Sequence, residues 1–388
     1  MSNIYIMTIQ QETYLALLRA ALRKGNELTI ELLTSDCVNE VIRLAAFQGT
    51  GPLVYDQLLK MLDLEISAEL CMQMKQQCMM SMMQQQVMMP ILSKAWTALE
   101  EADIHPVLLK GLALAQYYPQ PHLRQWGDID LYVGQKQYHQ ATKVLDATFP
   151  EADHPLVDDE ERKHYNYVFP NTVLELHRIS MGFAHPRDRK YYENLEVAYL
   201  TKDGPKFEVG GQRITTPEDT FNVFFTFLHA WHHFVETGMN MKQLCDVAVL
   251  LHAKRDVIDR VRLREMLRKL HLMEVWQLFM YIIANHLGLP KDVCPFYTDT
   301  CKERAELLFK RILRESSARN VESGKLKVDG GMSYLKRRWI TFQSRMSNSC
   351  LVKPYAPRYA RHMAWSNILH GIERTIKGSK TAYNVECV

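Results

Sequence analysis

The hydrophobic periodicity of this chain changes twice, and the two changes limit the folds that it can adopt. Apolar residues recur at three- and four-residue spacing over residues 8–101 and again from residue 217 to about 316, which predicts helices. Between these regions, residues 103–215 carry short apolar or alternating runs, which predict strands. We therefore expect an α/β (α+β) fold, in which a small mixed sheet is flanked by helices, with helical N- and C-terminal regions.

The same pattern divides the chain into four segments. We expect a helical N-terminal region over residues 1–102, an α/β core over 103–215, a helical C-terminal domain over 216–322, and a linker with a basic aromatic tail over 323–388. In the core, the predicted strands are residues 106–109, 128–133, 165–169 and 172–177, with a second hairpin around Val197–Ile214.

The N-terminal region holds an unusual run of methionines. Eight of the 20 methionines lie within Met72–Met89, and because methionine fills irregular helical cores, we expect this run to be core or an interface. Pro90 is expected to begin the next helix, because proline is favoured at the first helical position.

Composition excludes several classes of protein. Lys+Arg 47 against Asp+Glu 44 gives a net charge of +3 over 388 residues, so we expect no binding of long nucleic acid. No apolar run is long enough to span a membrane, and MSNIYIMTIQ lacks the features of a secretory signal. The eight cysteines show no CxxC zinc pattern, which favours free thiols in a reducing cytoplasm.

Three acidic residues of the core form the most informative pattern. Asp128 and Asp130 lie at i and i+2 of a predicted strand, so their side chains project from the same face. Glu175 lies in a later strand between apolar neighbours, where a carboxylate needs a partner or a metal. If the two strands are neighbours, the three acids converge. Such oxygen ligands suit Mg²⁺ and a two-metal site for in-line displacement at phosphorus.

A candidate phosphate site precedes these acids. Lys110-Gly111 ends a predicted strand and begins a helix, and a glycine there lets backbone N–H groups approach a phosphate. Lys110 and Arg124 are candidate cationic contacts to a triphosphate.

These motifs resemble a known group. The pattern Leu109-Lys110-Gly111, Tyr118-Pro119, Arg124 and Asp128-Ile129-Asp130-Leu131 is similar to the polymerase-β-type nucleotidyltransferase superfamily. More narrowly, it resembles a bacterial family of uncharacterised nucleotidyltransferases with the signature LKG…YP…R…DIDLLV. The resemblance covers roughly residues 20–260, with specific motifs at 107–133 and 172–178.

The resemblance implies a nucleotidyltransferase sheet and the transfer of a nucleoside monophosphate from an NTP to a hydroxyl acceptor, with two Mg²⁺ ions, for which Mn²⁺ is an alternative. The acceptor is a small molecule, a protein or an RNA end. Asp128 and Asp130 match the metal-binding acids, and Glu175 matches the third, which helps to deprotonate the acceptor. Leu112 follows Gly111, where the superfamily usually has Gly or Ser, so a catalytically degenerate nucleotide- or partner-binding protein stays an alternative.

A second alternative comes from histidines further along the chain. His229 and His233 are four residues apart on a predicted helix and, with Asp246, suggest a helical metal-dependent phosphohydrolase. The His-Asp dipeptide of such enzymes is absent, because His232 is followed by His233. We regard His233 and Asp246 as candidates for an acceptor pocket, and we expect Asp246, among apolar neighbours, to pair with a cation or to cap a helix. The sequence leaves the acceptor, the base preference and the oligomeric state open.

Overall fold

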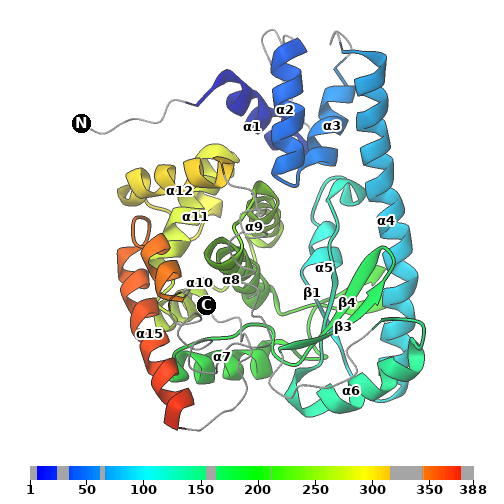
Figure 1. The fold of residues 1–388 in the computed structure, drawn as a ribbon, viewed down its shortest axis with the longest axis vertical. Coiled ribbons are helices and arrows are strands. Elements are labelled where there is room, and N and C mark those ends of the chain that lie inside the picture. Colours follow the sequence, from blue (N-terminus) through cyan, green and yellow to red (C-terminus); the bar gives the residue numbers. More distant parts are fainter. Residues whose placement is uncertain are drawn as a thin grey trace, which may run out of the picture.

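The computed structural model describes residues 7–23, 35–61, 66–153, 163–209, 211–314, 343 and 345–376. Figure 1 shows a small sheet beside one long helix, with further helices on the opposite side. The predicted fold class is confirmed by the described residues, which form a mixed sheet flanked by helices. The predicted linker over 323–331 and the basic run Lys336-Arg337-Arg338 lie outside these residues.

Helices dominate the N-terminal part of the chain. They are α1 (Ile9–Ala21), α2 (Ser35–Phe47), α3 (Gly51–Leu59) and α4 (Ala68–Glu101). The prediction that Pro90 begins a new helix is wrong, because Pro90 lies inside α4, which is 34 residues long. Packing explains this result: on either side of Pro90, Met88 and Leu92 are buried against the sheet, and this burial outweighs the local cost of an interior proline.

The methionine run of α4 is mostly exposed. Met74 and Met88 are buried, but Met72, Met79 and Met83 are 60–65% exposed. The expectation of a core position is therefore wrong for most of the run, because only one side of this part of α4 packs against the rest of the protein. An interface role stays a prediction.

The sheet and its helices follow. The elements are β1 (Val107–Leu109), α5 (Gly111–Ala115), β2 (Ile129–Tyr132), α6 (Gly134–Thr148), β3 (His164–Phe169), β4 (Thr172–His177) and α7 (Pro186–Tyr199). The strand order is β1-β2-β4-β3, in which β2 pairs in parallel with β4 and the other two pairings are antiparallel. A separate hairpin joins β5 (Lys206–Val209) to β6 (Gln212–Thr215). The predicted second hairpin is thus confirmed at 206–215, whereas residues 197–199 belong to α7.

The sheet separates a core from a cleft. Leu131, Leu174 and Leu176 point into a hydrophobic cluster with α4 and α6. Because side chains alternate along a strand, Asp130 and Glu175 project from the opposite face. The strand alternation therefore places apolar residues in the core and acids in the cleft.

The other wall of the cleft is helical. The C-terminal helices are α8 (Asp219–Glu236), α9 (Met241–Lys254), α10 (Arg260–Lys269), α11 (Met273–His286), α12 (Lys302–Arg314) and α15 (Pro357–Ile376). They share a second hydrophobic cluster with α1, α2 and α3. Gln48, which is fully buried, joins these groups: its amide nitrogen donates to the carbonyl oxygen of Ile312 at 2.9 Å, and its amide oxygen accepts from the N–H of Met241 at 2.9 Å. This contact fixes the start of α9 at the cleft.

Two further findings concern the surroundings of the protein. Within the described residues, no helix is both long and apolar enough to cross a membrane. The cysteines in the same part of the chain are free thiols, as the sequence predicts.

The buried carboxyl group of Glu196 on α7 holds the connection from β4 to α7. Its Oε1 accepts hydrogen bonds from the backbone N–H of Ser180 at 2.5 Å and from its hydroxyl at 2.6 Å. Burial raises the pKa of Glu196 from 4.5 to about 7, although both hydrogen bonds oppose this shift.

This pKa predicts a pH dependence of stability. Between pH 4.5 and about 7 the folded protein binds more protons than the unfolded chain, so Glu196 lowers the free energy of unfolding as the pH rises. Glu196→Gln keeps an acceptor for Ser180, and its stability relative to wild type should increase across this range by at most about 3 kcal/mol. Urea denaturation at several pH values measures this difference. An equal pH dependence in wild type and Glu196→Gln would contradict the assignment.

Candidate active site

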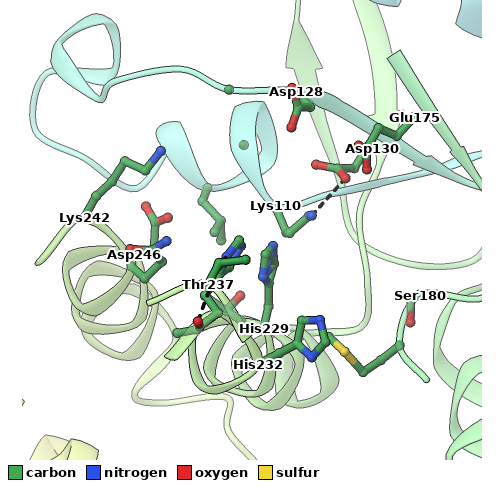
Figure 2. Close-up of a pocket in the computed structure, with 18 of the residues that line it drawn as sticks. Lys110, Asp128, Asp130, Glu175, Ser180, His229, His232, Thr237, Lys242 and Asp246 are labelled. Atoms are coloured by element: carbon green, nitrogen blue, oxygen red, sulfur yellow. Dashed lines mark hydrogen bonds and ion pairs between the residues drawn. The ribbon is translucent and has the colours of Figure 1, made fainter. Parts of the chain in front are cut away.

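A cleft of about 470 Å³ lies between the sheet and helices α8 and α9 (Figure 2). Helices α8 and α9 follow Pro217, so the cleft lies between the sheet and the predicted helical C-terminal domain. The structure brings together all the residues that the sequence singled out: Lys110, Gly111, Arg124, Asp128, Asp130, Glu175, His233 and Asp246.

The three acids converge because β2 and β4 are parallel neighbours. Asp130 in β2 is the register partner of Glu175 in β4, so their side chains leave the sheet side by side. Asp128 immediately precedes β2 and lies at the open edge of the cleft (Figure 2). The expected adjacency of the two strands is confirmed.

The acids differ in their electrostatic surroundings. Burial, together with the neighbouring carboxylates of Glu175 and Asp130, raises the pKa of Asp128 to about 6. Burial also acts on Asp130, but the charges of Lys110 and His177 outweigh it and hold the pKa of Asp130 below its usual value. At Asp128, the positive charges of the cleft therefore do not fully neutralise the negative charge of the carboxylates.

Lys110 and Gly111 form the turn from β1 into α5. Lys110 adopts a left-handed backbone conformation, with φ 49°, which is unusual for a residue with a side chain. Its ammonium group lies 2.9 Å from Oδ1 of Asp130. A side chain at Gly111 would meet the backbone oxygen of Asp128 at 3.1 Å, so this glycine allows the turn to approach the acidic strand. Lys110 thus contacts Asp130, a candidate metal ligand. Its contact with a triphosphate stays a prediction.

Sequence reasoning missed His177 and His164. Nε2 of His177 lies 2.9 Å from Oδ1 of Asp130 and 3.3 Å from Oε2 of Glu175. Burial alone lowers the pKa of His177, but these two contacts outweigh burial and raise it. His164, its register partner on β3, lies 3.8 Å from Oε1 of Glu175. The signal was present, because His177 is two residues after Glu175 and therefore lies on the same strand face.

Arg124 and Asp246 form a buried pair across the cleft. The guanidinium group donates from Nε and Nη2 to the two carboxylate oxygens of Asp246, at 2.7 and 2.8 Å. The hydroxyl of Tyr118 donates to Oδ1 of Asp246 at 2.7 Å. The expectation that Asp246 pairs with a cation is confirmed. The pair joins the Tyr-Pro and Arg motifs to α9, and the expected nucleotide contact of Arg124 stays a prediction.

The histidines of α8 line the side of the cleft opposite the acids. The rings of His229 and His233 stack with centroids 4.4 Å apart. Burial, together with the nearby charge of Lys110, lowers the pKa of His233 to about 3 and also lowers that of His229, so both are neutral at pH 7. Nε2 of His232 pairs with Glu236 at 3.0 Å. Neither His229 nor His233 belongs to a cluster of three metal-ligating groups in the described part of the chain.

Lys242, in the first turn of α9, is a second residue that sequence reasoning missed. Its side chain points into the cleft between Asp128 and Asp246 (Figure 2). Burial and the charge of Arg124 lower its pKa to about 8. Within the described residues, no hydrogen bond or ion pair engages its ammonium group, so Lys242 can accept an anionic group of a ligand.

Comparison with known proteins agrees with this geometry. The model of a family described as uncharacterised nucleotidyltransferase matches residues 35–288. The chain belongs to this family. The match extends from α2 to the end of α11 and includes every residue named in the cleft. No curated protein and no solved structure matched the chain.

The buried pair predicts a strong effect on stability. Asp246→Leu leaves the guanidinium group of Arg124 buried without its partner, and it should lower the free energy of unfolding by about 3–5 kcal/mol. Arg124→Met should do the same to Asp246. The double variant should lose clearly less than the sum of the two, because it buries no unpaired charge. Chemical denaturation of the four proteins measures this coupling, and additive losses would show that the pair contributes nothing of its own.

Proposed function

We propose that this member of the family transfers a nucleoside monophosphate from an NTP to a hydroxyl group of a small molecule, a protein or an RNA end, with Mg²⁺ as cofactor. The single observation that supports this proposal most strongly is the register of β2 with β4. It sets Asp130 against Glu175, with Asp128 at the same edge and a cleft in front. Family membership supports the general kind of reaction.

The donor set fits the proposed metal. Asp128, Asp130 and Glu175 offer only carboxylate oxygens, which Mg²⁺ and its substitute Mn²⁺ prefer. After burial, the carboxylates of Glu175 and Asp130 contribute to the raised pKa of Asp128, and divalent cations would relieve this repulsion. Two ions held by these acids would supply positive charge to the phosphates and would activate the attacking oxygen. Lys110 and His177 contact Asp130, and their positive charge would add to that of the metal ions in neutralising the acids.

Residues of the chain would bind and orient the two substrates. Lys242 and the turn at Lys110-Gly111 face the cleft from opposite walls and would contact the phosphates. Glu175 would accept the proton of the acceptor hydroxyl. The neutral ring of His233 would line the acceptor pocket. Asp246 is already bound by Arg124 and Tyr118, so its part in that pocket would be to hold the cleft in shape.

Asp130→Asn tests the catalytic assignment. The variant keeps the size of the side chain but removes the carboxylate. The loss of charge stabilisation by the metal is worth several kcal/mol, so the rate of transfer should fall by about 10³-fold or more. The assay incubates protein, Mg²⁺ and each α-³²P-labelled NTP with a cell lysate and follows the label into an acceptor. Circular dichroism checks that the variant is folded. Undiminished transfer by Asp130→Asn would contradict the proposal.

Lys242→Met tests the phosphate contact separately. Removal of the ammonium group from this wall should raise KM for the NTP by about tenfold and change kcat less, because the group contacts substrate and no metal ligand. Lys254→Met, on the far end of α9, is the matched control, because its ammonium group pairs with Asp219 outside the cleft. An unchanged KM in Lys242→Met would place the phosphates elsewhere.

Two features favour a second candidate function. The ammonium group of Lys110 already neutralises Asp130, and Leu112 replaces the Gly or Ser that usually follows the turn glycine. A catalytically degenerate protein that binds a nucleotide or a partner would show both features. Such a protein would bind NTP in a titration but release no pyrophosphate with any lysate fraction, whereas the transferase releases one pyrophosphate for each labelled acceptor.

A further inference from the structure

A group of metal-ligating side chains lies on helix α7, at the α10–α11 turn and on helix α15, and none of them lines the cleft. One donor atom each from Asp188, His271 and His362 lies within 4.8 Å of the other two. Nε2 of His362 lies 2.6 Å from Oδ2 of Asp188. The rings of His271 and His362 are tilted by 31° relative to each other, with centroids 3.9 Å apart. From this geometry we propose that Asp188, His271 and His362 bind one Zn²⁺ ion, which fastens α15 to α7 and to the turn between α10 and α11.

The ligand types fit zinc better than magnesium. Two imidazole nitrogens and one carboxylate are typical zinc ligands, at bond lengths of about 2.0–2.2 Å. Donor atoms around a tetrahedral zinc ion lie about 3.3 Å apart by that bond length. The three donor atoms, which lie within 4.8 Å of one another, would move closer to this spacing when they bind the ion. His185 borders the group, but its Nδ1 accepts the N–H of Arg187 as the cap of α7, so we assign the remaining coordination position to water.

The backbone at His271 is a second, independent observation. It directly follows the C-cap residue of α10 and has φ 59°, a left-handed conformation. The N–H of Leu272 bonds the carbonyl oxygen of Leu267, as in a Schellman motif, where glycine is the usual residue because it has no side-chain clash. A histidine costs about 1 kcal/mol there. A ligand for its imidazole accounts for a histidine at a position that local stability alone would give to glycine.

Charge supports the same conclusion. The carboxylate of Asp188 is buried, and it faces three imidazole rings, those of His185, His271 and His362. A divalent ion bound by imidazole nitrogens and by this carboxylate would place a positive charge beside the buried Asp188.

The location gives the ion a structural role. The three ligands come from segments that are more than 80 residues apart in the sequence. Figure 1 shows α15 along the outer side of the helical part, with α7 and α10 beside it. A metal that binds only the folded protein, where these distant segments meet, adds to its stability by mass action.

The test measures zinc in the full-length protein. The protein is purified without a histidine tag, incubated with ZnCl₂, desalted and analysed by inductively coupled plasma mass spectrometry. Wild type should retain one zinc per chain. His271→Gly and His362→Gln should lose it, whereas His252→Gln, at an exposed histidine of α9, and Asp130→Asn, in the cleft, should keep it.

His271→Gly separates metal binding from folding. Glycine suits the left-handed position, so the zinc-free variant should be at least as stable as zinc-free wild type. Zinc should raise the thermal midpoint of wild type and leave that of His271→Gly unchanged. The proposal is overturned if wild type holds no zinc after desalting, if both ligand variants keep it, or if only Asp130→Asn loses it, because the ion then belongs to the cleft.

Discussion

Repulsion among the three carboxylates on one face of the sheet is the constraint on which the cleft depends. The parallel pairing of β2 with β4 sets Asp130 beside Glu175, and a sheet cannot hold such a pair without compensating charge. Part of the compensation comes from Lys110, held in a left-handed turn, and part from His177 at the end of β4. The repulsion that remains between Asp128 and its two acidic neighbours would be relieved by the proposed divalent cation.

The second wall of the cleft depends on polar contacts in a largely apolar region. Gln48 fixes the start of α9, and the pair of Arg124 with Asp246 fixes its middle against the Tyr118 turn. Because these groups are buried and satisfied, α9 presents Lys242 to the cleft at a defined place. The sheet thus supplies negative charge and α9 supplies positive charge, an arrangement suited to a substrate with a phosphate chain.

Local patterns predicted much of this structure. The alternation around Asp130 and Glu175 indicated both the strands and the faces on which the acids lie, and the family resemblance is confirmed. Sequence reasoning failed where distant residues decide, because Pro90 lies inside a helix whose neighbouring turns pack on the sheet. It predicted a cation beside Asp246 but could not identify Arg124, which lies 122 residues away. His177 could have been found, because it shares the strand periodicity of Glu175.

The central claim is that the acids hold divalent metal in front of a nucleotide. Its most direct test is a crystal structure with Mn²⁺ and a non-hydrolysable NTP, in which anomalous scattering locates the ions. The account predicts Mn²⁺ bound by Asp128, Asp130 and Glu175, with the phosphates between this site and Lys242. Mn²⁺ absent from these carboxylates in a crystal that contains the bound nucleotide would contradict it.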